Sequence, residues 1–188
     1  MKIRVHFFIH IALLLLLSVG LQFGTPSIAD QPKTAGMIKI GKFYMDIYEY
    51  PNIIGELPVT NVTWAEATAM CEAIGKRLCT PEEWVLACRG PQGLRYPYGP
   101  TYDPTKCNSE SQVDRPQRIG ETPSTCVSGY GVYDLNGNVW EWVGTSLDQE
   151  VSIRGGAWSS SSCAECALKF WEHKPESQSD RVGFRCCK

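Results

Sequence analysis

The sequence of 188 residues predicts an α+β domain that combines two helices and short strands with a long irregular segment and is held together by disulfides. Three observations predict this class. Two segments carry the capping pattern of a helix start, short strand-like segments occur near both ends of the domain, and all nine cysteines lie between Cys71 and Cys187.

The N-terminal segment, residues 1–29, is typical of a secretory signal peptide. It has a basic start, an apolar run over residues 7–19 and small residues at the cleavage positions. The alternative is an uncleaved membrane anchor, although this run is short for a bilayer span. We therefore expect a secreted or periplasmic protein with a flexible segment at residues 30–36 and one domain at residues 37–188, free of the membrane after cleavage.

The charge of the chain narrows the possible partners. Lys and Arg number 18 and Asp and Glu number 20, which gives a formal net charge of −2 at pH 7. A balance so mild, with both signs interspersed, argues against nucleic-acid binding. The remaining partners are a protein or a small-molecule ligand, which the sequence does not identify.

Short strands are predicted at both ends of the domain. Residues 37–50 alternate between apolar and polar side chains, which indicates one or two strands that end at Pro51. The segments 151–158 and 181–187 are also strand-like, although they are too short to show a clear period.

Two helices are predicted from their first turns. The run Thr63-Trp64-Ala65-Glu66 is a capping box, and apolar residues then recur at helical spacing as far as Gly75. Thr80-Pro81-Glu82-Glu83 repeats the signal with proline in the first turn, and this helix ends by Gly90. Asn61-Val62-Thr63 is also a glycosylation sequon, but the helix cap is the better explanation of Thr63.

The stretch of residues 91–130 is rich in Pro, Gly, Ser, Asp and Asn and shows no regular pattern. Forty irregular residues inside a domain need disulfides or bound ions to hold them, and Cys107 and Cys126 are natural partners on this argument. An exported chain with nine cysteines is expected to form disulfides, and the odd number leaves at least one thiol over or paired between chains. Composition alone leaves the pairing open.

Five stretches then occur in a characteristic order, and together they resemble the formylglycine-generating enzyme, or sulfatase-modifying factor, family. They read LPVTNVTWAEATAMCEAIGKRLCTPEEWVLACRG, YPYG, GVYDLNGNVWEW, RGGAW and GFRCC. The resemblance covers residues 37–188. It implies a formylglycine-generating-enzyme-like fold with low regular secondary structure, two helices and short twisted antiparallel sheets, related to the C-type-lectin-like architecture.

The resemblance bears on activity through two positions. The family's oxidases use oxygen and a copper ion held by two thiols to convert a cysteine of sulfatase clients to formylglycine. Counted from Arg154 of the Arg-Gly-Gly turn, the thiol positions are Ser160 and Glu165 here, and a serine hydroxyl cannot replace a thiolate for copper(I). We therefore expect a structural or ligand-binding module without oxidase activity. The alternative is a copper-dependent formylglycine-generating oxidase that uses a shifted pair, Cys163 and Cys166.

Other metals are less well supported. A related family member uses iron held by three histidines, but His173 is the only histidine outside the predicted signal peptide. A zinc site built from Cys163, Cys166, Cys186 and Cys187 would need clustered free thiols, which an oxidising compartment disfavours. A binding function rests on fold analogy and on aromatic residues of the irregular half, namely Tyr96, Tyr98, Trp158 and Trp171.

The resemblance also implies a disulfide framework. The family joins the first helix to the terminal Gly-Phe-Arg-Cys motif and the second helix to a cysteine about twenty residues before that motif. Two further cysteines lie near the ends of the first bridge and are placed to pair. With the pair in the irregular segment, the expected bridges are Cys71–Cys186, Cys88–Cys166, Cys107–Cys126 and Cys79–Cys187, and Cys163 remains free.

A structural calcium site is the last implication. In the family the stretch that matches DLNGNVWEW wraps a calcium ion, and the ligands here would be the side chains of Asp134 and Glu141 and the carbonyls of Gly137 and Val139. Calcium prefers six to eight oxygen ligands, which suits this set. The alternative is a plain turn followed by a strand, with Asn-Gly as a hairpin signal.

Overall fold

The computed structural model describes residues 34–161, 164–170 and 173–188. The predicted signal peptide, most of the predicted flexible segment, and Cys163 and Trp171 lie outside these ranges. The chain divides into two units, Met1–Gln31 and Pro32–Lys188, and every helix and strand of the described residues belongs to the second. Within the described ranges, no helix is both long and apolar enough to cross a membrane.

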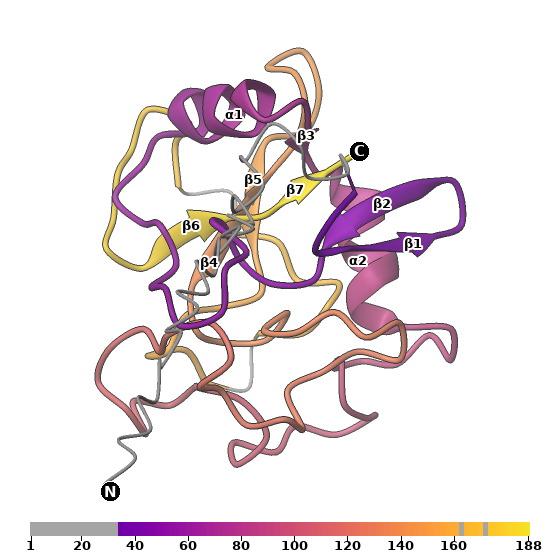
Figure 1. Ribbon diagram of the computed structural model, residues 1–188. Coiled ribbons are helices and arrows are strands. Elements are labelled where there is room, and N and C mark those ends of the chain that lie inside the picture. Colours follow the sequence, from indigo (N-terminus) through magenta and orange to yellow (C-terminus); the bar gives the residue numbers. More distant parts are fainter. Residues whose placement is uncertain (1–33, 162–163, 171–172) are drawn as a thin grey trace, which may run out of the picture. The chain divides into compact units, whose positions relative to one another are not determined.

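The first sheet is antiparallel and joins the two ends of the domain (Figure 1). The alternating stretch after residue 36 forms a hairpin in which Ile40 pairs with Phe43. The next strand in space comes from the end of the domain, because Met45 pairs with Cys187. The sheet order is β1 (Met37–Ile40), β2 (Phe43–Asp46), β7 (Cys186–Cys187) and β3 (Arg77–Leu78).

The second sheet is mixed, with the order β5 (Ser152–Arg154), β4 (Trp140–Val143) and β6 (Val182–Phe184). β4 pairs with β5 in antiparallel fashion but with β6 in parallel, so the expectation of antiparallel sheets alone was incomplete. Alternation along β4 sends Trp142 into one buried apolar cluster and Val143 into the other. The sheet therefore lies between two parts of the core.

Both predicted helices are present, and each begins with a complete capping box. Helix α1 (Trp64–Ala73) is capped by Thr63, whose hydroxyl accepts from the Glu66 amide at 3.2 Å. Helix α2 (Pro81–Arg89) is capped in the same way by Thr80 and has proline in its first turn. These caps satisfy amides that a helix start otherwise leaves unpaired.

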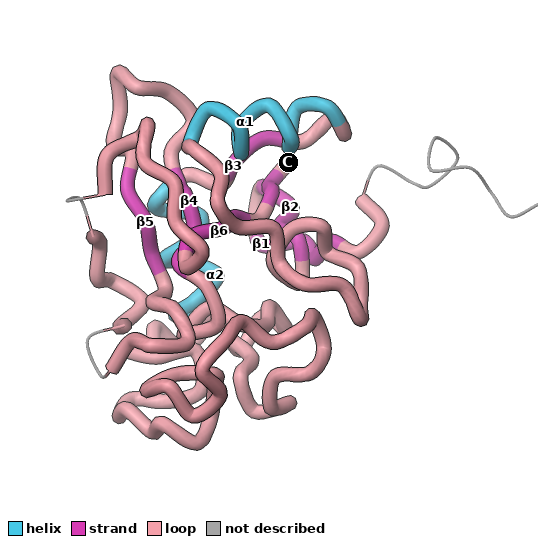
Figure 2. Tube along the Cα trace, turned by 90° about the vertical axis from the view of Figure 1, so that its left-hand side faces the viewer, coloured by secondary structure: helices cyan, strands magenta, loops and turns pink. Residues whose placement is uncertain are grey.

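Between α2 and β4, residues 90–139 contain no helix or strand. Figure 2 shows this segment as loops gathered on one side of the helices and strands. Of the four disulfides between described residues, Cys107–Cys126 lies wholly inside it. The other three bridge distant segments and are Cys71–Cys186, Cys79–Cys187 and Cys88–Cys166. These are the four pairs that the family resemblance and the spacing imply.

Candidate functional site

A buried ion pair forms the centre of the turn that carries the predicted calcium ligands. Arg185 donates from Nε to Glu141 Oε2 at 2.8 Å and from Nη2 to Oε1 at 2.7 Å. Trp84 of α2 donates its indole N–H to the same carboxylate at 2.7 Å. Both charged residues are almost fully buried, with exposed fractions of 0% for Glu141 and 1% for Arg185. Such a bidentate pair is among the stronger hydrogen-bonded contacts in proteins.

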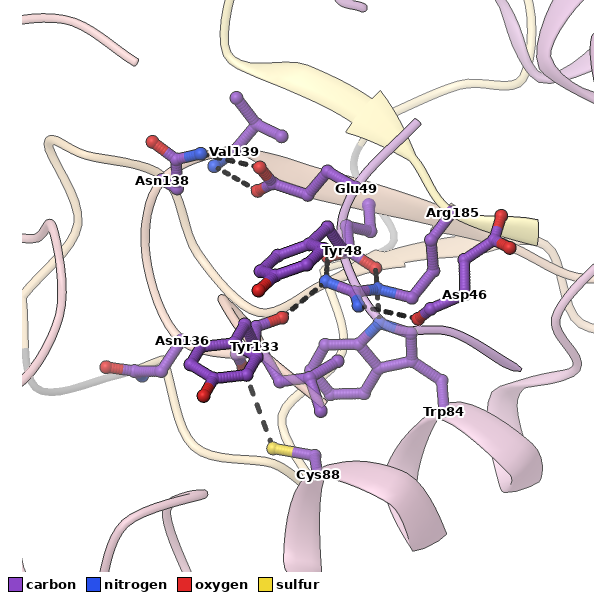
Figure 3. Close-up of polar contacts among 12 residues, drawn as sticks. Asp46, Tyr48, Glu49, Trp84, Cys88, Tyr133, Asn136, Asn138, Val139 and Arg185 are labelled. Atoms are coloured by element: carbon purple, nitrogen blue, oxygen red, sulfur yellow. Dashed lines mark hydrogen bonds and ion pairs between the residues drawn. The ribbon is translucent and has the colours of Figure 1, made fainter. Parts of the chain in front are cut away.

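Arg185 also donates to three backbone carbonyls in two other segments of the chain. Its Nη1 donates to the carbonyls of Asp46 and Ile47, both at 3.2 Å, and its Nη2 donates to the carbonyl of Tyr133 at 2.8 Å. Figure 3 shows the guanidinium beside Trp84 with these contacts around it. The side chain has five N–H donors, and these bonds account for all of them. A charged residue between Phe184 and Cys186 was the sequence signal for this role, but it did not identify the partner.

Glu49 is a third member of this cluster that the sequence analysis missed. It is fully buried, and its carboxylate accepts from the Asn138 side chain and, at 3.2 Å, from the Val139 amide (Figure 3). Burial, followed by the charges of Asp134 and Glu141, raises the pKa of Glu49 well above its ordinary value. The Glu49 carboxylate therefore holds the turn at residues 138–139 by accepting from the side chain of one residue and the backbone amide of the next.

Asp134 differs from the other two carboxylates because its oxygens are not engaged. It is 1% exposed, and neither oxygen has a hydrogen-bond partner of normal geometry among the described residues. Burial raises its pKa to about 6, while the nearby Thr122 hydroxyl and Arg185 act in the opposite direction. Burying a carboxylate without hydrogen-bond partners costs folding free energy, so a cation bound at Asp134 would be stabilising.

The predicted calcium set fits this arrangement only in part. Asp134 offers free oxygens, whereas both oxygens of Glu141 already accept from Arg185 and Trp84. Gly137 has a φ of +84°, and a Cβ there would collide with the Asn108 carbonyl, so the turn is tightly packed. Within the described residues no three His, Cys, Asp or Glu side chains are grouped to hold a metal ion. Of the two side-chain ligands in the predicted set, only Asp134 fits calcium as it stands.

The two oxidase positions are occupied by residues with other roles. The Ser160 hydroxyl accepts from the Ala157 amide at 2.9 Å and so closes the turn after the Arg-Gly-Gly segment. The Glu165 carboxylate pairs with Arg95 at 2.6 Å on the surface. Neither group is a soft ligand for copper(I).

The alternative copper pair, Cys163 and Cys166, lacks a free thiol at Cys166. Cys166 is bonded to Cys88 with an S–S distance of 2.02 Å, so its sulfur is not a free thiolate. The same applies to Cys186 and Cys187, which removes three of the four ligands of the zinc alternative.

His173 packs against Trp142 with ring centres 5.2 Å apart, and burial lowers its pKa.

The aromatic residues suggested for binding are mostly packed. Tyr96 is only 2% exposed and stacks against Tyr98, with ring centres 5.8 Å apart. Burial raises the pKa of Tyr98 to about 12. Trp158 is half-buried beneath the Arg181 guanidinium, 5.0 Å from the ring centre. Tyr96 and Tyr98 thus form part of the irregular segment's own packing, whereas Trp158 packs against Arg181 outside that segment.

Comparison with known proteins places this site in context. The model of the sulfatase-modifying factor enzyme 1-like domain family matches residues 30–188. The inactive C-alpha-formylglycine-generating enzyme 2 of Bos taurus is 35% identical over 151 residues, which is 70% of this chain and 50% of that protein. The formylglycine-generating enzyme of Mus musculus is 29% identical over 162 residues, 69% of this chain and 43% of that protein. The chain thus spans half or less of these curated relatives.

Two solved structures have the same fold. Treponema denticola variable protein 1 superposes with a TM-score of 0.62 at 16% identity and covers 82% of this chain and 91% of its own. PvdO from Pseudomonas aeruginosa gives a TM-score of 0.57 at 20% identity, with 70% and 62% covered. At this level of identity the likeness concerns the fold alone.

Proposed function

The chain belongs to the sulfatase-modifying factor enzyme 1-like domain family, and from this premise we propose that it is an exported binding domain that does not carry out the family's oxidase reaction. The observation that carries the proposal is the state of the two thiol positions. Ser160 closes a turn, and Glu165 is paired with Arg95, so neither position offers a sulfur. The likeness to a relative named as inactive supports the same view.

The disulfide of Cys166 weighs against the copper alternative. Copper(I) prefers thiolate ligands, and a pair at Cys163 and Cys166 would require the Cys88–Cys166 bridge to be opened. Opening it would also release the end of α2 from the segment that follows β5. The bridge therefore serves the domain better as a structural link than as a reservoir of thiols.

A binding role agrees with the physical character of the domain. Its long loops are held by disulfides and buried amide side chains, and loops fixed on a rigid scaffold are common binding surfaces. Four disulfides also favour an oxidising compartment, which is the basis for proposing a secreted or periplasmic location. The partner would be a protein or a small molecule. A structural calcium ion at Asp134 is a separate part of the proposal, tested below.

Thiol mapping of the native protein tests the proposal. Alkylation under denaturing, non-reducing conditions followed by mass mapping should label Cys163 alone and recover a peptide that links Cys88 to Cys166. A sulfatase-type cysteine peptide incubated with the protein, copper(I) and oxygen should yield no formylglycine peptide. A variant with Ser160→Cys and Glu165→Cys is the matched control, because it restores thiols at both positions and should bind copper(I). Alkylation of both Cys163 and Cys166, or conversion of the substrate cysteine to formylglycine by the unaltered protein, would contradict the proposal.

A further inference from the structure

A groove lies along the outer face of α2, on the side away from the buried ion pair. It has a volume of about 530 Å³, within the range of about 300–1,000 Å³ that is usual for ligand sites. Helix α2 forms one wall, and the segment that leads into and through β5 forms the other. The lining residues that matter are Glu82, Val85, Leu86, Arg89, Glu150 and Arg154.

The helix wall presents an apolar centre between two opposite charges. Positions 82, 85, 86 and 89 share one face at helical spacing, while Trp84 and Cys88 on the other face enter the core. Leu86 is 44% exposed, on a face where a soluble helix usually carries polar side chains. Along the helix, Glu82 and Arg89 are separated by about 10.5 Å.

The two charges at the ends of this face are available to a partner. Among the described residues, Glu82 makes no hydrogen bond or ion pair, although its charge acts on Arg154. Arg89 donates only to the carbonyls of Leu94 and Gly93 and pairs with no described carboxylate. A free anion at one end and a free cation at the other define a polarity for whatever lies in the groove.

The opposite wall is fixed before any ligand arrives. Arg154 is 5% exposed and donates to the carbonyls of Ala167 and Leu168 and, at 3.0 Å, to the Glu150 carboxylate. Its Nε is buried and has no hydrogen-bond partner among the described residues. A fixed wall lowers the ordering cost of binding.

We propose that this groove binds an extended peptide segment of a partner protein, with a basic side chain against Glu82, an apolar side chain over Val85 and Leu86, and an acidic side chain against Arg89. In an extended chain alternate residues point the same way and lie about 6.7 Å apart, so the three side chains stand at positions i, i+2 and i+4. The inference goes beyond the proposed function because it assigns a surface and a partner chemistry. It does not depend on whether the protein has oxidase activity.

The experiment is a nitrogen-15 NMR titration of the disulfide-intact protein with blocked peptides. Acetyl-Gly-Lys-Ser-Leu-Ser-Glu-Gly-amide should shift amide signals of residues 82–93 and 150–154. It should bind about fivefold more tightly than the analogues with two glutamates or two lysines, as expected for one exposed ion pair. Glu82→Lys should reverse the preference in favour of the two-glutamate peptide.

Two serine variants distinguish binding in the groove from non-specific hydrophobic binding elsewhere on the surface. Leu86→Ser should weaken binding about tenfold, in keeping with the loss of an apolar contact. Ile54→Ser removes a side chain that is 72% exposed but outside the groove, and it should leave binding unchanged. No shift at millimolar peptide, shifts elsewhere, equal affinity for all three peptides, or no reversal with Glu82→Lys would overturn the proposal. So would a dimer, seen by sedimentation, that Leu86→Ser abolishes, because the occupant would then be a second copy.

Discussion

The domain contains two regions that are ordered by different means. In the frame of helices and sheets, backbone ladders and capping boxes supply the hydrogen bonds. In residues 90–139 there is no helix or strand, and buried amide side chains add to the scattered backbone hydrogen bonds of its turns. Asn136 donates to the Ala164 carbonyl, and the Asn138 oxygen accepts from Asn108 and from the Gln117 amide. Order without secondary structure thus depends on specific polar side chains, each of which is costly to lose.

The two regions meet at Arg185. Its guanidinium binds Glu141 in β4 and the Tyr133 carbonyl in the irregular segment at the same time. Substitutions in the frame, at this junction and in the irregular segment should therefore differ in how much unfolding free energy they remove and in how much of the domain they destabilise. The four predictions below run from the largest expected effect to the smallest.

The disulfides should have the largest effect, and they should separate the two regions. Serine substitution of both interleaved pairs, Cys71–Cys186 and Cys79–Cys187, opens links between residues 115 and 108 apart and should cost about 6 kcal/mol of unfolding free energy. The matched variant without Cys107–Cys126, whose cysteines are 19 apart, should cost about 3 kcal/mol. Urea unfolding gives both values, and hydrogen exchange should show the second loss concentrated in residues 90–139. An equal and global loss in both variants would erase the distinction.

Breaking the junction should come next. Arg185→Met leaves Glu141 buried without its partner, which should lower the unfolding free energy by about 3–5 kcal/mol. Arg77→Met is the control, because it breaks the partly exposed pair with Glu83 and should cost about 0–1 kcal/mol. Urea unfolding is again the measurement. Similar losses in the two variants would mean that burial does not govern these pairs.

Calcium should act on the irregular region by a smaller amount. If Asp134 binds calcium with a dissociation constant of about 10⁻⁴–10⁻³ M, 5 mM calcium added to a chelated sample should stabilise by about 1–2 kcal/mol and raise Tm by a few degrees. Asp134→Asn tolerates the positive φ of 62° and removes the charge, so it should shrink the response. Without calcium the same variant should be more stable than the unaltered protein at pH 7, because a buried unpaired charge is gone. A calcium response of equal size in both proteins would contradict a role for Asp134.

The smallest effect is expected from His173, which packs on the frame at Trp142. Burial lowers its pKa, so the unfolded chain takes up the proton more readily than the folded one. Its contribution to stability should be complete above the ordinary histidine pKa of about 6.5 and should be lost as the pH falls through that value. Unfolding measured between pH 7.5 and 5.5 should show this slope in the unaltered protein and a shallower one in His173→Gln. Parallel curves would remove His173 as the cause.

These regions also differ in how far the sequence predicts them. The helix starts at Thr63 and Thr80 were predictable because a capping box is a contact between residues three apart. The pairing of Glu141 with Arg185 was not, since 44 residues separate them and no local pattern connects them. The parallel pairing of β4 with β6 and the burial of Glu49 could not be predicted for the same reason, because their partners are distant in the sequence. A charged residue flanked by apolar neighbours, as in Trp140-Glu141-Trp142, indicates that a buried partner exists but not which one.

The disulfide topology has a consequence for how the chain would reach its native pairing in the oxidising compartment that we propose. Cys71 and Cys79 precede their partners Cys186 and Cys187 by 115 and 108 residues, and the two links interleave along the chain. A chain that enters an oxidising compartment from its N-terminus exposes Cys71, Cys79 and Cys88 long before their partners arrive. Oxidation in order of emergence would join these neighbours wrongly. Maturation should therefore depend on thiol–disulfide exchange, and the yield of native protein should respond to a disulfide isomerase more than to added oxidant.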